Sequence, residues 1–548
     1  MVVRFLLLWS GLTSSFLAFS QYNFNRHDSL RGSLNSFRSC FDVHYYDLNI
    51  SIDITQKNIS GYNTIHFRTT ALTNKIQLDL FRNMRIDSVC FNSEKLLFDR
   101  DSNAFFVQFP ETLPSLTNHA LTVYYHGEPI IAKKAPWDGG WVFTKDSLRR
   151  PWVGVACEGI GASLWWPLKD HLSDEPDSMR MTYTIPASLI AIGNGNLESI
   201  DSSSASLKSY TWKVNNPINS YNVTCNIAHY DHIKESHIQL NKDTLAIDYY
   251  ILDYNKSKAL KHFKQVHPML NCYEHYFGPY PFAKDGFAMV ETPYWGMEHQ
   301  GAIAYGNNYA NRIIFDTIVM DYIIIHETAH EWWGNNVSTS DHADMWIHES
   351  FATYTENLWV EYLYGYNMSV RYLNLNKSRI KNKESIIGPK DVNYNNWQGS
   401  DMYYKGAWIL HSFRNMLQND TLWFNILKGI QQEFALKTTS TESIIEYINT
   451  KTGSDYTWFF KQYLYQAEPP VLLWFYEKKK GKIYLAYKWG NVNPDFKMPI
   501  YLYLCSGNKI KVTPTAEYQR TKYGKQQKNG ELFDINSNYY LTKQIKKL

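Results

Sequence analysis

Apolar and polar residues alternate along much of the first half of the chain, the pattern of strands that bury one face. Turn residues interrupt these runs at short intervals between residues 40 and 253. Such spacing favours an antiparallel saddle or sandwich over alternating strands and helices. The clearest predicted strands are 45–54, 60–67 and 120–125.

The apolar period changes to that of helices between about residues 254 and 466. Within this part, Ala407-Trp408-Ile409-Leu410 and Met416-Leu417 place apolar side chains on one helix face. The middle part of the chain is therefore predicted to be mainly helical. Its predicted helices are 256–277, 317–333, 349–364, 404–418 and 441–450.

Strand patterns return after Pro469-Pro470, two prolines that disrupt helices and strand ladders alike. The predicted strands here are 472–476, 482–487, 500–504 and 509–512. We therefore predict a multidomain α+β protein. Its parts are an N-terminal antiparallel β-saddle or sandwich (21–253), a mainly α domain (254–466) and a small C-terminal β-sandwich (467–548).

Residues 1–20 differ from the rest of the chain in kind. Arg4 precedes an apolar run over 5–19, and small residues follow at its end, as in a signal peptide. The run is too short for a comfortable transmembrane span. We expect export to the periplasm or secretion, with no transmembrane span after cleavage; an uncleaved anchor is the alternative.

Charge and cysteine content exclude some functions and leave others open. The 548 residues carry 55 Lys plus Arg against 52 Asp plus Glu, a balance without a broad field for nucleic acid. The lysines at 478–480 and Lys482 are typical of an exposed hairpin tip. Six cysteines without a C-x-x-C pair leave disulfide pairing open, and oligomeric state is equally undetermined.

The strongest chemical signal is His326-Glu327-Thr328-Ala329-His330. Positions i and i+4 share one helix face, so both imidazoles can reach one ion. Zinc in a hydrolytic site takes three protein ligands. Glu349, which opens a second helical run and is separated from His330 by 18 residues, is the predicted third ligand. Glu356 follows on the same face and can accept a hydrogen bond from a liganding imidazole. The pattern predicts one Zn²⁺ per chain.

Glu327 lies between the two histidines and is not needed as a ligand. We predict that it acts as general base on the zinc-bound water, whose pKa falls to about 7 on the metal. The resulting hydroxide attacks a carbonyl, and Glu327 returns the proton to the leaving amine. The motif alone thus predicts metal-assisted hydrolysis.

The spacing of these four residues resembles that of the gluzincin aminopeptidases, the family typified by aminopeptidase N. That family carries H-E-x-x-H, 18 residues and then Glu, and its W-L-N-E-G-F-A segment resembles residues 346–352, with His348 and Ser350 as departures. The resemblance implies a thermolysin-like catalytic domain between the two β domains. Many relatives add a large helical C-terminal domain, which is not seen before Leu548; the site is then expected to be more open or closed by a second subunit.

Two carboxylates are implied by the same resemblance to bind the substrate's α-amine. The family's G-x-M-E-N corresponds to residues 295–299, so that Glu298 binds the amine while Gly296 and Met297 line the substrate cleft. Trp295 and His299 depart from that motif. Glu158, in a Q-x-E-A-like segment, is the implied second amine ligand.

Tyr403 occupies the tyrosine position of the family's Y-E-K-G segment, where the phenol donates to the developing oxyanion. The resemblance implies a zinc aminopeptidase acting on peptides with a free N-terminus. Two alternatives stay open: an exported zinc endopeptidase without amine anchors, and a non-catalytic peptide-binding protein on the same fold. The preferred N-terminal residue is undetermined.

Overall fold

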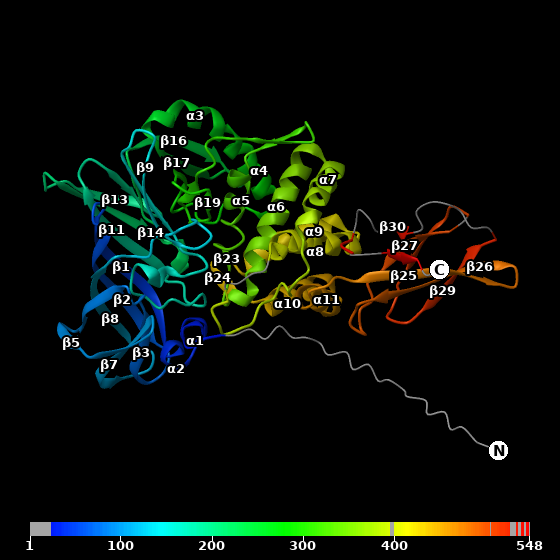
Figure 1. The fold of residues 1–548 in the computed structure, drawn as a ribbon, viewed down its shortest axis with the longest axis horizontal. Helices are drawn as coiled ribbons and strands as arrows, with labels where there is room; N and C mark the ends of the chain where they lie inside the picture. The colour runs from blue at the N-terminus through cyan, green and yellow to red at the C-terminus, as the bar shows by residue number, and fades with distance from the viewer. Residues whose placement is uncertain are drawn as a thin grey trace, which may run out of the picture.

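The computed structural model describes residues 24–394, 399–504, 506–525, 533–534, 539–541 and 544–546. The predicted signal peptide lies outside these ranges. No helix in the described ranges is long and apolar enough to cross a membrane. Figure 1 shows N-terminal strands at one end of the long axis, helices in the middle and the last strands at the other end.

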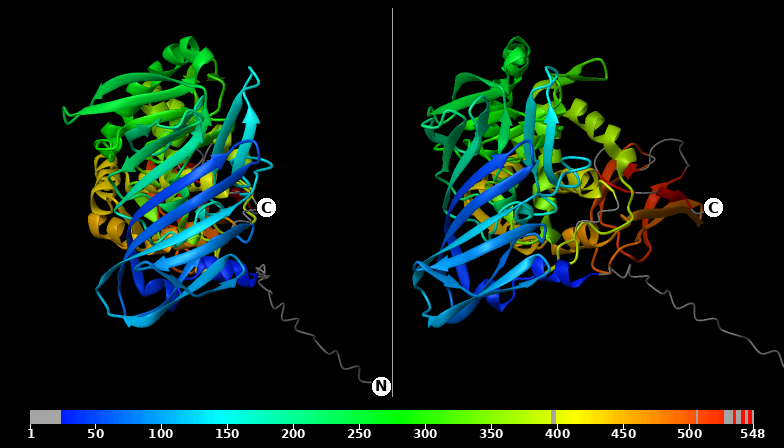
Figure 2. Two further views of the ribbon diagram at one scale, coloured as in Figure 1. Left: turned by 90° about the vertical axis from the view of Figure 1, so that its left-hand side faces the viewer. Right: turned by 60° about the vertical axis from the view of Figure 1, so that its left-hand side comes forward.

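A large eight-stranded sheet dominates the N-terminal part, and its strands lie side by side in Figure 2. Burial alternates along β1, as expected for a sheet with one face on the core. β1 and β11 pair in parallel, so the prediction of antiparallel pairing fails there; a long connection permits it. The order is β13 (Asn196–Asp201), β14 (Leu207–Val214), β11 (Ser178–Pro186), β1 (Phe41–Asp53), β2 (Asn58–Thr69), β8 (Asn118–Gly127), β4 (Met84–Phe91), β5 (Glu94–Leu96).

Two smaller sheets complete this part of the molecule. One has the order β3 (Thr73–Asp79), β7 (Ala104–Leu113), β6 (Phe98–Asp101). The other has the order β12 (Ile190–Ile192), β15 (Asn226–Ala228), β10 (Pro151–Ala156), β9 (Gly140–Lys145). β10 matters for the site, because Glu158 follows two residues after its end.

A five-stranded sheet joins the N-terminal part to the helical part. Its order is β16 (Tyr230–Ile238), β17 (Thr244–Leu252), β18 (Phe287–Glu291), β20 (Ile303–Tyr305), β19 (Gly296–Met297). β17 and β18 pair in parallel, so the ladder crosses the domain limit predicted at residue 253. The predicted domain limits remain predictions. β19 is the edge strand of this sheet, and its two residues line the cleft of the candidate site.

The middle part is mainly helical, and some of its helices begin elsewhere than predicted. Residues 318–320 form β22 (Ile318–Met320) with β21 (Arg312–Ile314), where the sequence pattern predicts a helix. The β-branched residues of these two segments are compatible with the apolar period of a helix or of a strand. Pairing of the two segments in a hairpin selects the strand. α6 begins at Trp346 rather than Glu349. The helices are α3 (Lys256–His262), α4 (Val266–Phe277), α5 (Tyr322–Ala329), α6 (Trp346–Tyr364), α7 (Tyr366–Asn376), α8 (Asp401–Leu417), α9 (Asp420–Glu433), α10 (Thr441–Thr452) and α11 (Thr457–Tyr465).

The described C-terminal residues form two further sheets. Lys480 and Gly481 make the turn between β25 and β26, which confirms the predicted hairpin tip. One sheet has the order β29 (Gln519–Gly524), β26 (Lys482–Gly490), β25 (Val471–Lys479), β31 (Gln544–Lys546). The other has the order β28 (Lys509–Val512), β27 (Ile500–Tyr503), β30 (Phe533–Asp534).

The five cysteines within the described ranges are all unpaired thiols, so no disulfide joins them. Four of the five are buried among apolar side chains, namely Cys40, Cys157, Cys225 and Cys272. Burial raises the pKa of Cys272 and Cys225 well above the ordinary value. They therefore pack as small apolar residues.

Candidate active site

Three donor atoms from α5 and α6 converge on one point. His326 Nε2 lies 3.4 Å from His330 Nε2 and 3.4 Å from Glu349 Oε2. His330 Nε2 lies 3.6 Å from the same oxygen. Tetrahedral zinc with bonds of about 2.0–2.1 Å holds its donors roughly 3.4 Å apart. The donor set and its spacing therefore fit a zinc ion held by His326, His330 and Glu349.

Each imidazole is oriented by a bond on its far nitrogen. His326 Nδ1 lies 2.8 Å from Glu356 Oε1, and His330 Nδ1 lies 2.9 Å from the carbonyl oxygen of Trp333. Both Nδ1–H groups donate, which leaves the Nε2 lone pairs facing the common point. Tyr372 donates to Glu356 Oε2 at 2.5 Å. Trp333 and Tyr372 were not found from the sequence, since no motif marks them.

Asp321 fixes the start of α5. Its carboxylate accepts from the backbone N–H of Ile323 at 3.0 Å and from Tyr305 at 2.7 Å. His262 Nε2 and Asn307 Nδ2 both lie 2.8 Å from the same carboxylate. This N-cap residue is buried and both of its carboxylate oxygens accept hydrogen bonds, which fixes the start of the helix that carries His326 and ends at His330.

Glu349 combines one bonded oxygen with one free oxygen. Tyr403 donates to its Oε1 at 2.9 Å, while the buried Oε2 accepts no hydrogen bond from the described residues. A buried carboxylate oxygen without a donor suits a metal ligand. The structure thus places Tyr403 beside the donor set. Ser350, a departure from the family segment, donates to the carbonyl oxygen of Met402 at 2.6 Å and so joins α6 to α8.

Glu327 faces Gly296, the first residue of β19. A Cβ built on Gly296 would lie 2.5 Å from Glu327 Oε1 and 2.9 Å from Ile323 Cγ2, so a larger residue here would displace the Glu327 side chain. Burial raises the pKa of Glu327 to about 8, against the opposing charge of His326. A carboxylate with a pKa near neutrality can both accept and return a proton.

Glu298 and Glu158 lie in the same cleft as the donor set. Glu298 is only 3% exposed and accepts from Tyr221 at 3.1 Å. Burial, and then the charge of Glu298, raise the pKa of Glu158. Burial also raises the pKa of Glu298, where the opposing charge of His330 outweighs the added effect of Glu349. Among the described residues that line the cleft there is no lysine or arginine. The excess negative charge therefore favours the binding of cations that the chain itself does not supply.

The cleft is closed beyond Glu298. Tyr221 and His348 are both buried there, with 3.4 Å between the Tyr221 hydroxyl and His348 Nδ1. His348 Nε2 accepts from the backbone N–H of Thr339 at 3.0 Å. His348, a departure from the family segment, therefore supports Tyr221. His299, the other histidine among the departures, is buried, and burial lowers its pKa to about 3, so it is neutral.

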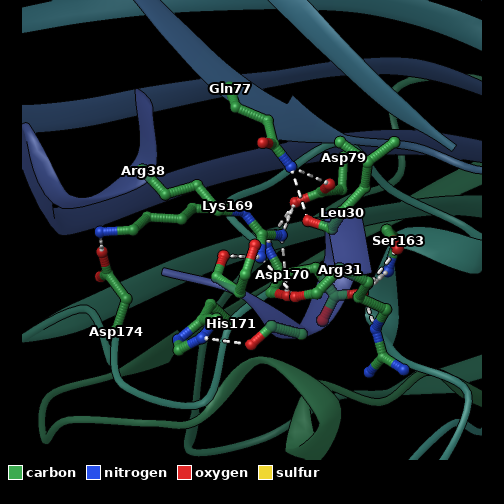
Figure 3. A network of polar contacts seen from close by, with 12 residues as sticks. Leu30, Arg31, Arg38, Gln77, Asp79, Ser163, Lys169, Asp170, His171 and Asp174 are labelled. Atoms are coloured by element: carbon green, nitrogen blue, oxygen red, sulfur yellow. Dashed lines mark hydrogen bonds and ion pairs between the residues drawn. The ribbon is translucent and has the colours of Figure 1, made fainter. Parts of the chain in front are cut away.

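The N-terminal segment supports the loop that carries Glu158. Figure 3 shows Arg31 of this segment within a network of polar contacts that includes Asp170 and Ser163. Arg31, in α1 (Arg26–Gly32), donates to the carbonyl oxygen of Gly159 at 2.9 Å and to Asp170 Oδ2 at 3.2 Å. Asp170 also accepts from the Ser163 hydroxyl at 2.5 Å. Arg31, Ser163 and Arg38 outweigh burial and lower the pKa of Asp170. No local motif marks Arg31, so the sequence could not reveal this support.

The opposite end of the cleft is open and aromatic. The cleft has a volume of about 510 Å³, and Trp137 and Trp295 lie on its wall. The Trp295 ring stacks on Tyr322 at 5.6 Å, and Tyr322 stacks on His326 at 5.2 Å. The sequence singles out Trp295 only as a departure and does not reveal Trp137.

Comparison with known proteins points to one family for the helical part of the chain. A sequence description of the peptidase family M1 domain matches residues 261–463, the segment that holds His326, His330 and Glu349. This segment is a peptidase family M1 domain. The match confirms the resemblance to the gluzincin aminopeptidases. Zinc dependence is a property of this family, and the donor set of the M1 domain fits it.

Named relatives agree with this assignment over short stretches. Aminopeptidase N of Oryctolagus cuniculus is 32% identical over 105 residues, 17% of this chain and 11% of that protein. Endoplasmic reticulum aminopeptidase 1 of Mus musculus is 26% identical over 196 residues, 32% of this chain and 20% of that protein. The chain therefore spans a small part of the curated relatives that it matches.

Solved structures share the fold over a longer stretch. A mutant M1 zinc metallopeptidase from Deinococcus radiodurans, bound to a Tyr-Ser-Ala substrate, superposes with a TM-score of 0.66 and 20% identity. The superposition covers 78% of this chain and 94% of that one. A two-domain M1 zinc metallopeptidase mutant bound to L-tryptophan gives a TM-score of 0.67 and 21% identity. The likeness establishes an M1 peptidase fold with an N-terminal β domain and a helical part.

Proposed function

We propose that the protein is a zinc aminopeptidase that removes single residues from peptides with a free N-terminus. One observation carries the proposal: two carboxylates, Glu298 and Glu158, line the cleft that holds the donor set, and Glu298 is buried there. They can pair with one ammonium group, whereas a blocked N-terminus would leave them unpaired and mutually repelling. The middle part is proposed to be a thermolysin-like catalytic domain, followed by a β-sandwich.

Zinc bound by His326, His330 and Glu349 would act as a Lewis acid on the scissile carbonyl and would acidify water. Glu327 removes the proton from the attacking water and delivers it to the nitrogen of the leaving amine. Tyr403 turns its hydroxyl from Glu349 Oε1 to the carbonyl oxygen and donates a hydrogen bond as negative charge develops there. Glu298 and Glu158 hold the ammonium group and so place the first peptide bond over the donor set.

Export belongs to the proposal as well. It rests on the pattern of residues 1–20, with Arg4 before an apolar run. Expression of the full chain with detection in the periplasmic or culture fraction tests it. Retention of the unprocessed chain in the cytoplasm would contradict it.

A matched pair of peptides tests the function. Free and N-acetylated forms of one short peptide are incubated with the protein, with and without a chelator, and products are separated by mass spectrometry. We expect stepwise loss of N-terminal residues from the free peptide only, abolished by the chelator and restored by zinc.

The alternatives give different outcomes in the same assay. Equal cleavage of the acetylated peptide at internal bonds would indicate a zinc endopeptidase. Peptide binding without any cleavage in the zinc-loaded protein would indicate a non-catalytic peptide-binding protein.

A further inference from the structure

Two exposed tryptophans form one continuous surface on the cleft wall. Trp137 is 64% exposed and Trp295 is 42% exposed, and their ring centroids lie 6.2 Å apart. No other tryptophan within the described ranges is an exposed hydrophobic residue. Both line the cleft that holds the donor set. Exposed aromatic surface inside a cleft is typical of a binding site.

Trp295 lies toward the end of the cleft away from Glu298, and Trp137 lies beside it. Trp295 contacts Tyr322, one helical turn before His326 in α5, whereas Glu298 lies with Glu327 and His330 within one 4.8 Å group. Residues 295–298 therefore run along α5 from the Tyr322 end to the His330 end. A peptide whose ammonium group is held at Glu298 and whose carbonyl lies over the donor set must continue toward Trp295.

The Trp295 ring is held in place before any substrate binds. Its Nε1–H donates to Asn307 Oδ1 at 3.1 Å, and Asn307 donates to Asp321 Oδ1 at 2.8 Å. Asp321 caps α5, so the ring is tied to the helix that carries the histidines. A ring fixed by stacking and by a hydrogen bond loses little entropy when a side chain packs on it.

From this geometry we propose that Trp295 and Trp137 bind the side chain of the second substrate residue, the first residue of the leaving peptide. The proposal rests on the proposed aminopeptidase function. The surface selects flat or bulky apolar side chains, because offset aromatic contacts add to the burial of apolar area. It disfavours glycine at this position, because glycine has no side chain to pack against the two rings.

Dipeptides with a constant first residue test this selection. Values of kcat/KM are measured for Ala-Phe, Ala-Leu and Ala-Gly, with alanine amide as a substrate that has no second side chain. We expect an Ala-Phe to Ala-Gly ratio of about 30 in the wild type. The ratio should fall about tenfold in Trp295→Ala and in Trp137→Ala. Trp295→Phe keeps an aromatic ring and should retain most of the preference for Ala-Phe over Ala-Gly.

Tyr362→Ala is the matched control, since Tyr362 is 43% exposed on α6 and does not line the cleft. Its selectivity ratio should equal that of the wild type. A ratio near one in the wild type, or a ratio that is unchanged in Trp295→Ala, would overturn the assignment.

Calorimetry separates this proposal from the proposed function. In Glu327→Gln, which should bind without turnover, Ala-Phe is expected to bind about tenfold more tightly than Ala-Gly. Trp295→Ala in the same background should remove the difference. If the wild type fails to hydrolyse alanine amide, the proposed function fails, while the binding difference still decides the role of the tryptophans.

Discussion

The two ends of the cleft differ in exposure and in chemistry. Glu298 is 3% exposed and hydrogen-bonded to a buried tyrosine, while Trp295 is 42% exposed and offers an apolar face. A buried charge must find the same counter-charge in every ligand, whereas an exposed ring accepts side chains of many shapes. The difference indicates that the site requires the ammonium group, which every substrate shares. The side chain of the second substrate residue changes only how well a substrate is bound.

The largest effect is expected at Glu327, between the two ends. Glu327→Gln keeps the size of the side chain but removes the proton acceptor, so kcat should fall about a thousandfold. Zinc content, measured by atomic emission on the purified variant, should stay at that of the wild type. Substantial residual activity in zinc-loaded Glu327→Gln would exclude Glu327 as the general base.

Removal of the charge at the closed end should have the next largest effect. Glu298→Ala leaves the ammonium group without its buried partner, so kcat/KM for a free peptide should fall about a hundredfold. Glu298→Gln, which keeps the shape and removes the charge, should behave similarly. If both variants matched the wild type on free peptides, amine recognition would have to lie elsewhere.

The support behind Glu158 gives a smaller effect. Lysine in place of Arg31 cannot reach Gly159 and Asp170 together, so KM should rise about tenfold with less change in kcat. Arg26→Lys in the same helix is the control, because the Arg26 side chain is 72% exposed and pairs only with Asp101. Thermal unfolding and kinetics are measured on both variants. An identical KM in the two variants would contradict a positioning role for Arg31.

The smallest effect is expected at Tyr221. Tyr221→Phe removes one hydrogen bond to Glu298, worth about 1 kcal/mol, or roughly fivefold in kcat/KM. Tyr210→Phe serves as control, since its hydroxyl donates to Leu189 away from the cleft. An effect confined to free-amine substrates would sharpen the contrast between the ends. An equal loss in Tyr210→Phe would assign the effect to stability alone.

Much of the fold could be predicted from local periodicity, and the exceptions have physical reasons. The strands 45–54 and 60–67 lie within β1 and β2 apart from one residue at 54, because half-buried strands alternate strictly. Residues 318–320 were predicted to be helical and form a strand. β-branched residues fit both periods, and pairing with Arg312–Ile314 decides between them.

The sequence by itself determined which metal-binding and general-base residues lie close together on one helix. His326, Glu327 and His330 are related by local geometry, and an i, i+4 spacing has the same meaning in any α-helix. Only the tertiary structure decided what surrounds that face. Tyr221, Trp137 and Arg31 reach the cleft from segments distant in sequence, through loops and packing that follow no period. Contacts of that kind depend on the whole core, so no local pattern encodes them.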